Sequence, residues 1–120
     1  MTLRDETQPA PPYRRASMSK AEQDVLAERR RQVEVEGWDH AHDDEEHPDG
    51  QLAMAGACYA AHSEMETTQM WRMLWPWDGK WWKPKDRRSD LVRAAALLIA
   101  EIERIDRAAL QDQQESSDAG

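Results

Sequence analysis

The sequence has no phenylalanine, only one cysteine and no long apolar run, and these absences exclude several classes of protein. The longest uninterrupted apolar stretch, Ala94–Ala100, has seven residues, whereas a membrane-spanning helix needs about 20. A membrane protein is therefore not expected. Cys58, being alone, can form no intramolecular disulfide and cannot belong to a zinc site built from several cysteines.

The net charge and the N-terminal residues indicate which partners and which compartment are expected. The formal net charge is −8, which disfavours binding to nucleic acid or to anionic membranes unless a local basic patch outweighs the total. The first residues include acids and arginines but no hydrophobic segment like that of a secretory signal. Together with the single cysteine, this predicts a cytoplasmic protein.

The 120 residues are enough for one domain. Residues 1–18 hold three prolines among polar side chains, which predicts a flexible tail. Residues 111–120 are almost free of apolar side chains, and we expect a disordered tail there as well. The folded domain is thus predicted to span residues 19–110.

No segment has the alternating pattern of a strand, so the predicted fold class is all-α: a small bundle of three long helices with a Trp-rich loop. Ser19 and Glu22 form a capping box at the start of the first helix, and Gly37 is suited to end it. A second helix is expected over about residues 50–66, with Asp49 as its cap.

The last helix, expected to begin at Asp86 or Ser89, has the clearest pattern. Its apolar residues recur at steps of three and four, which predicts a central position in the bundle. Since the first helix has few apolar residues, the core is small, and we expect an oligomer that shares helices. The recurring residues are Leu91, Ala95, Leu98, Ile102, Ile105 and Ala109.

The first group of candidate functional residues is acidic. Glu28, Gln32 and Glu36 recur at every fourth position, and six further acids follow in a loop expected at positions 39–49. Carboxylates that converge on one point need a cation between them, and oxygen ligands suit Mg²⁺ or Mn²⁺. The alternative is that the row and the acidic loop simply face solvent.

The histidines of the same loop raise the question of zinc. His40, His42 and His47 are separated by two and five positions, which matches no standard zinc-binding pattern. The last helix offers two more acids, Asp90 and Glu101, but at 1.5 Å per residue they lie about 16 Å apart and cannot share one ion. Asp90 has an alternative role at the positive end of the helix dipole, and Glu101 needs a cationic partner within its apolar surroundings.

The second group combines tryptophan with basic residues. Five of the six Trp lie between positions 71 and 82, next to five Lys and Arg residues at positions 80–88. Flat rings stack on bases, and cationic side chains bind phosphate oxygens, so this set is suited to a nucleotide. The alternative is that the Trp rings cover the open end of the bundle, with Lys and Arg stems lying across them.

Four sequence segments, taken in order, resemble a known family: ERRRQVEVEGWDHAHDD, GQLAMAGACYAA, WPWDGKWWKPKDRR and SDLVRAAALLIAEIERIDR. They are similar to MazG-like members of the all-α nucleoside triphosphate pyrophosphohydrolases, small phage and bacterial proteins, over about residues 28–107. Within that family the chain resembles the phage enzymes that trim dATP or dGTP pools. The resemblance implies a helical bundle that forms a dimer or tetramer, in the host cytoplasm if a phage encodes it.

The resemblance also implies an activity, the release of pyrophosphate from a (d)NTP with Mg²⁺ or Mn²⁺ as cofactor. Glu36, Asp43 and Asp44 are the expected catalytic residues. The expected metal ligands are Glu28, Glu36, Asp43, Asp44, Asp90 and Glu101. The expected nucleotide-binding residues are Gln32, Trp75, Trp77 and Trp82, with Lys83, Lys85 and Arg87 on the phosphates.

Two positions depart from the family pattern. Relatives often have Glu where Gln51 stands, and Arg87 replaces a Glu three residues before Asp90. A catalytically inactive nucleotide-binding protein therefore remains an alternative. A third interpretation is a module in which the Trp-rich loop docks on nucleic acid or on another protein and the acids are inert.

Overall fold

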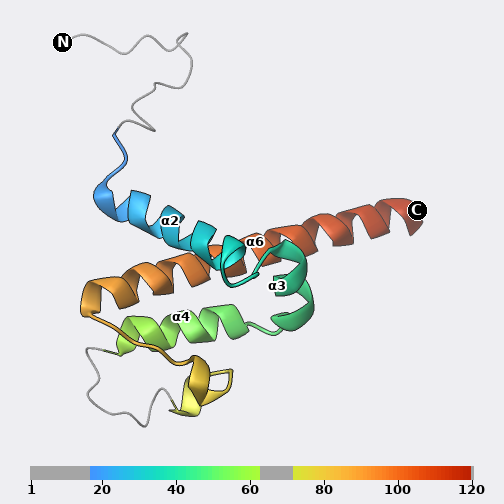
Figure 1. The fold of residues 1–120 in the computed structure, drawn as a ribbon. Helices are drawn as coiled ribbons and strands as arrows, with labels where there is room; N and C mark the ends of the chain where they lie inside the picture. Colours follow the sequence, from blue (N-terminus) through green and yellow to red (C-terminus); the bar gives the residue numbers. More distant parts are fainter. Residues whose placement is uncertain (1–16, 63–71, 120) are drawn as a thin grey trace, which may run out of the picture.

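The structure, a computed structural model, describes residues 17–62 and 72–119 (Figure 1). All regular structure in these two ranges is helical, which confirms the all-α prediction. The elements in chain order are α2 (Lys20–Glu34), α3 (His40–Glu46), α4 (Gln51–Ala61), the short 3₁₀ helix η1 (Gly79–Trp81) and α6 (Arg87–Ala119).

Helix α6 is the central element, as the sequence predicts. It packs against α4 on one side and against α2 on another (Figure 1). Helix α3, which lies between α2 and α4 in the chain, also contacts α6. The C-terminal part of α6 extends beyond the other helices. None of the helices in the described ranges combines the length and the apolar content needed to cross a membrane.

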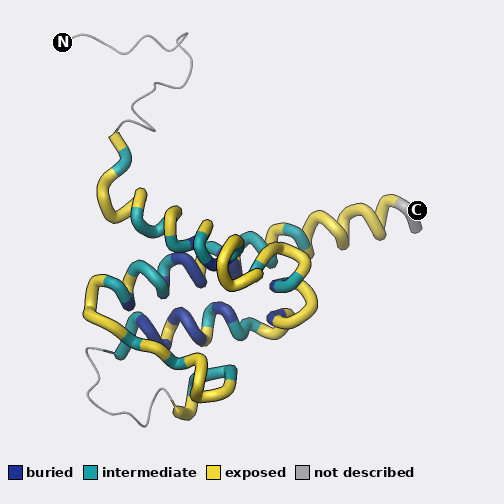
Figure 2. Tube along the Cα trace, viewed as in Figure 1, coloured by how far each residue is buried: buried dark blue, intermediate teal, exposed yellow. Residues whose placement is uncertain are grey.

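The core lies between α4 and α6, whose facing sides are buried (Figure 2). At Gly56 the two helices approach so closely that an added Cβ would lie 3.2 Å from the carbonyl oxygen of Ala94. Trp rings cover this core from one side. The buried core residues are Leu52, Ala55 and Tyr59 of α4 and Ala94, Leu97 and Ala100 of α6.

Local capping explains where α2 begins. The Ser19 hydroxyl accepts from the backbone N–H of Glu22 at 3.0 Å, and the Glu22 carboxylate accepts from the backbone N–H of Ser19 at 3.1 Å. The predicted capping box is thus confirmed. After α2 ends at Glu34, Gly37 has a φ of +76°, the left-handed conformation expected of it.

The cap predicted for the second helix is wrong. Gly50, not Asp49, occupies the N-cap position of α4, with a φ of +84° and no side-chain cap. Asp49 instead donates its backbone N–H to the side chain of Gln51 at 2.8 Å. Helix α4 is described to Ala61, and the predicted extension over residues 63–66 lies outside the described residues.

The acidic segment expected as a loop contains helix α3. The Asp39 carboxylate caps it by accepting from the backbone N–H of His42 at 2.9 Å. Arginines from other elements then neutralise two of its acids: Arg29 contacts Asp43, and Arg107 contacts Asp44. This pairing with arginines from α2 and α6 lowers the repulsion among the acids of the segment and stabilises the helix.

Helix α6 begins where the sequence predicts but is longer. The Asp86 carboxylate accepts from the backbone N–H of Ser89 at 2.9 Å, as expected of a residue that starts a helix. The helix continues to Ala119, through most of the segment expected as a tail, because no Gly or Pro interrupts it after residue 86. Most of the predicted N-terminal tail, residues 1–16, lies outside the described residues.

The apolar stripe predicted for the core of α6 is largely exposed. Leu98, Ile102 and Ile105 keep 43%, 57% and 51% of their surface accessible. The buried side of α6 that faces α4 carries Ala94 and Leu97, and Leu98 lies only at the edge of this contact, beside Gly56. The stripe therefore forms an uncovered apolar face on the central helix.

Candidate functional site

An aromatic pocket of about 220 Å³ lies where α2, α4, α6 and the Trp-rich segment (residues 72–86) meet. Its aromatic lining is Trp38, Tyr59, Trp75, Trp77 and Trp81, and Leu97 adds an aliphatic patch. Its polar lining contains four cationic side chains and one carboxylate. These polar residues are Arg31, Gln32, Glu36, Lys83, Lys85 and Arg93.

The aromatic wall is built by rings that pack edge to face. Trp75 contacts Tyr59 and Trp77 in this way, with ring centroids 5.5 and 5.3 Å apart. Asp78 fixes the turn between the Trp residues, because its carboxylate accepts from the backbone N–H of Lys80 and its carbonyl accepts from the Trp75 indole at 3.1 Å. The wall is thus held by hydrogen bonds as well as by packing.

Tyr59 ties the Trp-rich segment to α6. Its hydroxyl is buried and accepts from the backbone N–H of Lys83 at 3.2 Å and from Arg93 Nη1 at 3.1 Å. The same Arg93 nitrogen donates to the Lys83 carbonyl at 2.9 Å. These bonds fix the backbone of Lys83 and the guanidinium of Arg93 beside the pocket.

Two carboxylates on the α2 side share one arginine. Arg31 contacts Glu28 at 2.7 Å and Glu36 at 3.0 Å, and Arg93 lies 3.8 Å from Glu28. Partial burial works to raise the pKa of Glu28, but the hydrogen bond and charge of Arg31 and the charge of Arg93 outweigh it, so this pKa lies below its usual value. Glu28 is thus held in its ionised form.

Gln32 sits at the centre of this polar group. It is 1% exposed, so the expectation that this row faces solvent is wrong at its middle position. Its amide nitrogen lies 3.4 Å from a Glu28 carboxylate oxygen. Its Oε1 is buried without a hydrogen-bond partner among the described residues. An unsatisfied buried acceptor of this kind is costly unless a ligand or water supplies a donor.

The structure gathers most of the predicted nucleotide-binding residues in this pocket. Gln32, Trp75, Trp77, Lys83 and Lys85 all line it. The other lining residues were not predicted from the sequence. Arg31 could have been, because it lies within one helical turn of Glu28 and Gln32. The missed residues are Arg31, Trp38, Tyr59, Trp81 and Arg93.

Two predicted nucleotide-binding residues lie elsewhere. Trp82 packs its ring on that of Tyr59, with centroids 4.7 Å apart, and is not part of the pocket lining. Arg87 donates to the carbonyl of Ala60, near the end of α4, at 2.8 Å.

The structure does not bring the six predicted metal ligands together. Only Glu28 and Glu36 are close to each other, through Arg31. Asp43 and Asp44 are neighbours in sequence but contact different arginines, as described for α3. Hydrogen bonds from Arg107 lower the pKa of Asp44.

The two predicted ligands on α6 are also engaged separately. Asp90 is 1% exposed and accepts from the backbone N–H of Lys85 at 2.7 Å, and its other oxygen lies 3.2 Å from His62 Nδ1. Glu101 pairs with Arg104 at 2.6 Å, the cationic partner that its apolar surroundings require.

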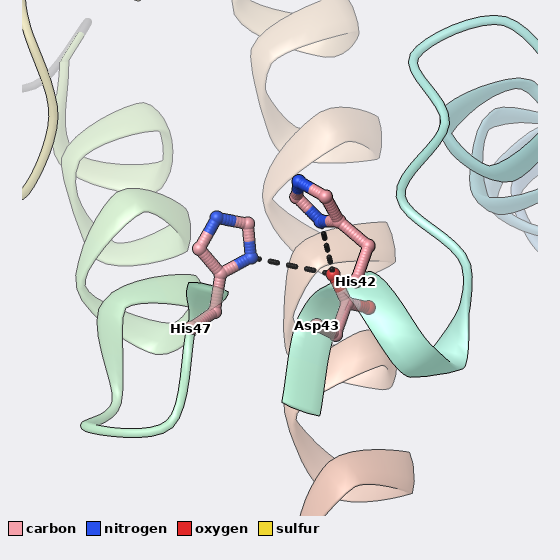
Figure 3. A group of neighbouring side chains, drawn as sticks. All are labelled: His42, Asp43 and His47. Carbon is pink, nitrogen blue, oxygen red and sulfur yellow. Dashed lines mark hydrogen bonds and ion pairs between the residues drawn. The ribbon is translucent and has the colours of Figure 1, made fainter. Parts of the chain in front are cut away.

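One group of metal-binding side chains does converge in the described ranges: His42, Asp43 and His47 (Figure 3). One ligand atom from each lies within 4.8 Å of the others. Figure 3 shows both imidazole rings directed at the same Asp43 oxygen, which lies 3.3 Å from His47 Nδ1 and 3.6 Å from His42 Nδ1.

A second cavity, of about 340 Å³, adjoins this histidine group. Its polar lining consists of His42, Glu46, His47 and Asp78. It shares Trp38, Trp77 and Trp81 with the aromatic pocket, so these rings separate the two cavities.

Comparison of the chain with protein-family models, with curated proteins and with solved structures finds no match.

Proposed function

We propose that the aromatic pocket binds a nucleoside triphosphate and that the chain hydrolyses it to the monophosphate and pyrophosphate. The observation that carries the proposal is the convergence of Gln32 from α2 with Trp75, Trp77, Lys83 and Lys85 from the Trp-rich segment around one cavity. The sequence and the family resemblance predict each of these residues to bind a nucleotide. Their meeting at one place is what a shared binding function requires.

The chemistry of the lining suits the two parts of a nucleotide. Indole and phenol rings stack on a base through their flat faces. Lys83, Lys85 and Arg93 supply positive charge for phosphate oxygens. The net charge of −8 does not oppose such binding, because the cations are concentrated at the pocket and many of the acids lie in and around α3.

The cofactor implied by the family resemblance is Mg²⁺ or Mn²⁺, which offsets phosphate charge and activates water when bound. The described residues form no oxygen-only group of three ligands, because each predicted acid is engaged by a cation or a backbone donor of the protein. In this proposal the ion enters with the triphosphate. Glu28 and Glu36 are the predicted ligands nearest the pocket.

The test is incubation of the full chain with each (d)NTP and Mg²⁺ or Mn²⁺, with chromatography of the products. We expect pyrophosphate and a monophosphate, with dATP or dGTP as the preferred substrate. Lys83→Met should weaken binding, measured by Trp fluorescence, whereas Lys80→Met, a change of the same type outside the pocket lining, should not. No pyrophosphate from any nucleotide would refute the activity, and binding without turnover would support the inactive nucleotide-binding alternative.

A second function is favoured by one observation. Trp81 is 49% exposed, and the ammonium groups of Lys80 and Lys83 lie 5.5 and 5.9 Å from its ring centroid. An exposed ring flanked by cations can stack on a base of single-stranded nucleic acid. A salt-sensitive mobility shift of single-stranded DNA without nucleotide hydrolysis would favour this function.

The proposal includes self-association through α6. Leu98, Ile102 and Ile105 form an exposed apolar face on the helix that is central to the bundle. Covering this face with the same face of a second copy would remove it from water and give a dimer, which can pair further into a tetramer.

A further inference from the structure

We propose that His42, Asp43 and His47 bind a nitrogen-preferring divalent transition metal, of which Zn²⁺ is the representative. This site lies outside the aromatic pocket lining and shares no residue with it. The inference therefore does not depend on nucleotide binding.

The backbone brings the three ligands together at the C-terminal end of α3. Asp43 lies within α3, and His47 is the C-cap residue of this helix, four positions later. Residues four positions apart on a helix lie one turn apart, so these two side chains lie on the same face. The same i, i+4 spacing serves paired zinc ligands on helices. His42, adjacent to Asp43, approaches the carboxylate from the other side (Figure 3).

The distances agree with tetrahedral coordination. With metal–ligand bonds of about 2.0–2.1 Å, two ligand atoms of a tetrahedral site are roughly 3.3–3.4 Å apart. The Asp43 oxygen lies 3.3 and 3.6 Å from the two Nδ1 atoms. The remaining edge is at most 4.8 Å, so a shift of at most roughly 1.4 Å between the two imidazoles would close the triangle.

The protein leaves one of these atoms unsatisfied. His42 Nδ1 is buried from solvent and has no hydrogen-bond partner among the described residues, because the Asp43 oxygen at 3.6 Å is beyond bonding distance. Asp43 is 0% exposed and His47 5%. A cation among the three would satisfy the buried His42 nitrogen, which the hydrogen bond between His47 and Asp43 leaves without a partner.

The surroundings support a bound cation. Arg29 holds the other Asp43 oxygen at 3.3 Å, which orients the carboxylate as groups behind metal ligands do. Trp38 and Trp77 pack against the His47 ring, with centroids 5.7 and 4.8 Å away, and limit its rotation. The six acids at positions 39–49 outnumber the two arginines, Arg29 and Arg107, that pair with Asp43 and Asp44, so the local charge stays negative.

The donor set selects the class of ion. Two imidazoles and one carboxylate suit Zn²⁺, Co²⁺ or Ni²⁺, whereas Mg²⁺ prefers oxygen ligands alone. Three protein ligands leave a fourth coordination position, for water or for a small molecule in the adjoining 340 Å³ cavity.

The experiment uses the full chain after treatment with a chelator. Zn²⁺ titration by calorimetry should show one ion per chain, and Co²⁺ should give the visible absorption bands of tetrahedral coordination. Co²⁺ should also quench Trp fluorescence, because Trp38 and Trp77 contact the His47 ring. A large excess of Mg²⁺ should not displace either ion.

Separate His42→Gln and His47→Gln substitutions should each lower Zn²⁺ affinity at least tenfold. The matched control is His40→Gln, an exposed histidine of the same helix outside the group, which should bind as the wild type does. Circular dichroism checks that each variant is folded. Absence of tetrahedral Co²⁺ bands, unchanged affinity in both ligand variants, or an equal loss in His40→Gln would overturn the proposal.

Discussion

The buried ion pair between Arg29 and Asp43 allows a prediction that can be worked out from the structure. Arg29 Nη2 lies 3.3 Å from the Asp43 carboxylate, and their side chains are 9% and 0% exposed. Arg29 also donates to Glu103 at 3.1 Å and to the carbonyl of Trp38 at 3.3 Å. One guanidinium therefore joins α2, α3 and α6.

Replacing Arg29 by Met keeps most of the side-chain length but leaves a buried carboxylate without its cation. Breaking a buried pair in this way costs about 3–5 kcal/mol of unfolding free energy. Glu103 adds little to this cost, because at 40% exposure it can turn to water. For a chain of this size the loss corresponds to a fall in melting temperature of roughly 12–20 °C. Asp43→Asn should cost less, about 1–2 kcal/mol, because Arg29 keeps its other two partners.

The measurement is urea denaturation followed by circular dichroism, at one protein concentration so that self-association does not change the comparison. The control is Arg30→Met, which alters an exposed arginine next in the chain. Combining Arg29→Met with Asp43→Leu should recover part of the stability, because neither charge then remains buried. If Arg29→Met and Arg30→Met differ by less than about 1 kcal/mol, the pair does not stabilise the fold as we argue.

Three further predictions concern the apolar face, the pocket and the response to acid. Ile102→Glu should shift the chain towards monomer in sedimentation experiments, because it places a charge on the face that we propose to be shared; an unchanged mass would contradict this. Tyr59→Phe should lose about 1 kcal/mol of stability and weaken nucleotide binding severalfold, because Lys83 loses its acceptor; equal affinity in a fluorescence titration would exclude this positioning role. Because the pKa of Glu28 is lowered in the fold, its stabilising contribution is present at pH values above 4.5, its ordinary pKa, and is lost as the pH falls through its lowered value. The melting temperature of Glu28→Gln should therefore fall less between pH 6 and pH 3 than that of the wild type. The same fall in both proteins would show that Glu28 does not contribute.

The local parts of the fold could be predicted from sequence. The capping box of Ser19 and Glu22 and the turn at Gly37 depend on residues within a few positions, so their pattern is visible in the chain. Helix α3 was missed because its stability depends on arginines that lie far away in sequence. Asp39, three residues before His42, was the local signal that could have revealed it.

The periodicity of α6 predicted a helix but misplaced its buried face. Small residues such as Ala94 allow α4 to approach closely, and that packing covers Leu98 only in part and leaves Ile102 57% exposed. A sequence with apolar residues on two neighbouring faces does not show which one its own chain covers. Gly56 on the facing helix marks the covered side, because it lies against Ala94 and Leu98.

The candidate site was predicted better in its aromatic part than in its acidic part. Lys83, Lys85 and their neighbouring Trp residues lie in one short segment, so proximity in sequence implied proximity in space. The acids come from α2, the turn after it, α3 and α6, and each has a partner that sequence spacing does not show. Asp43 is the clearest case, because it lies with two histidines whose spacing alone suggested no metal site.

Asp90 affects how far the segment between α4 and α6 can vary in length. Its carboxylate contacts His62, where the chain leaves α4, and Lys85, where the chain returns to α6. The two ends of the intervening segment are therefore held at one residue, whatever the length between them. Because the entropy of closing a loop grows only as the logarithm of its length, doubling this segment would cost about 0.6 kcal/mol. Insertions between these anchors should therefore be tolerated where they leave Trp75, Trp77 and Trp82 packed on the core, so the chain between α4 and α6 can change in length while the aromatic wall and the helices beneath it stay in place.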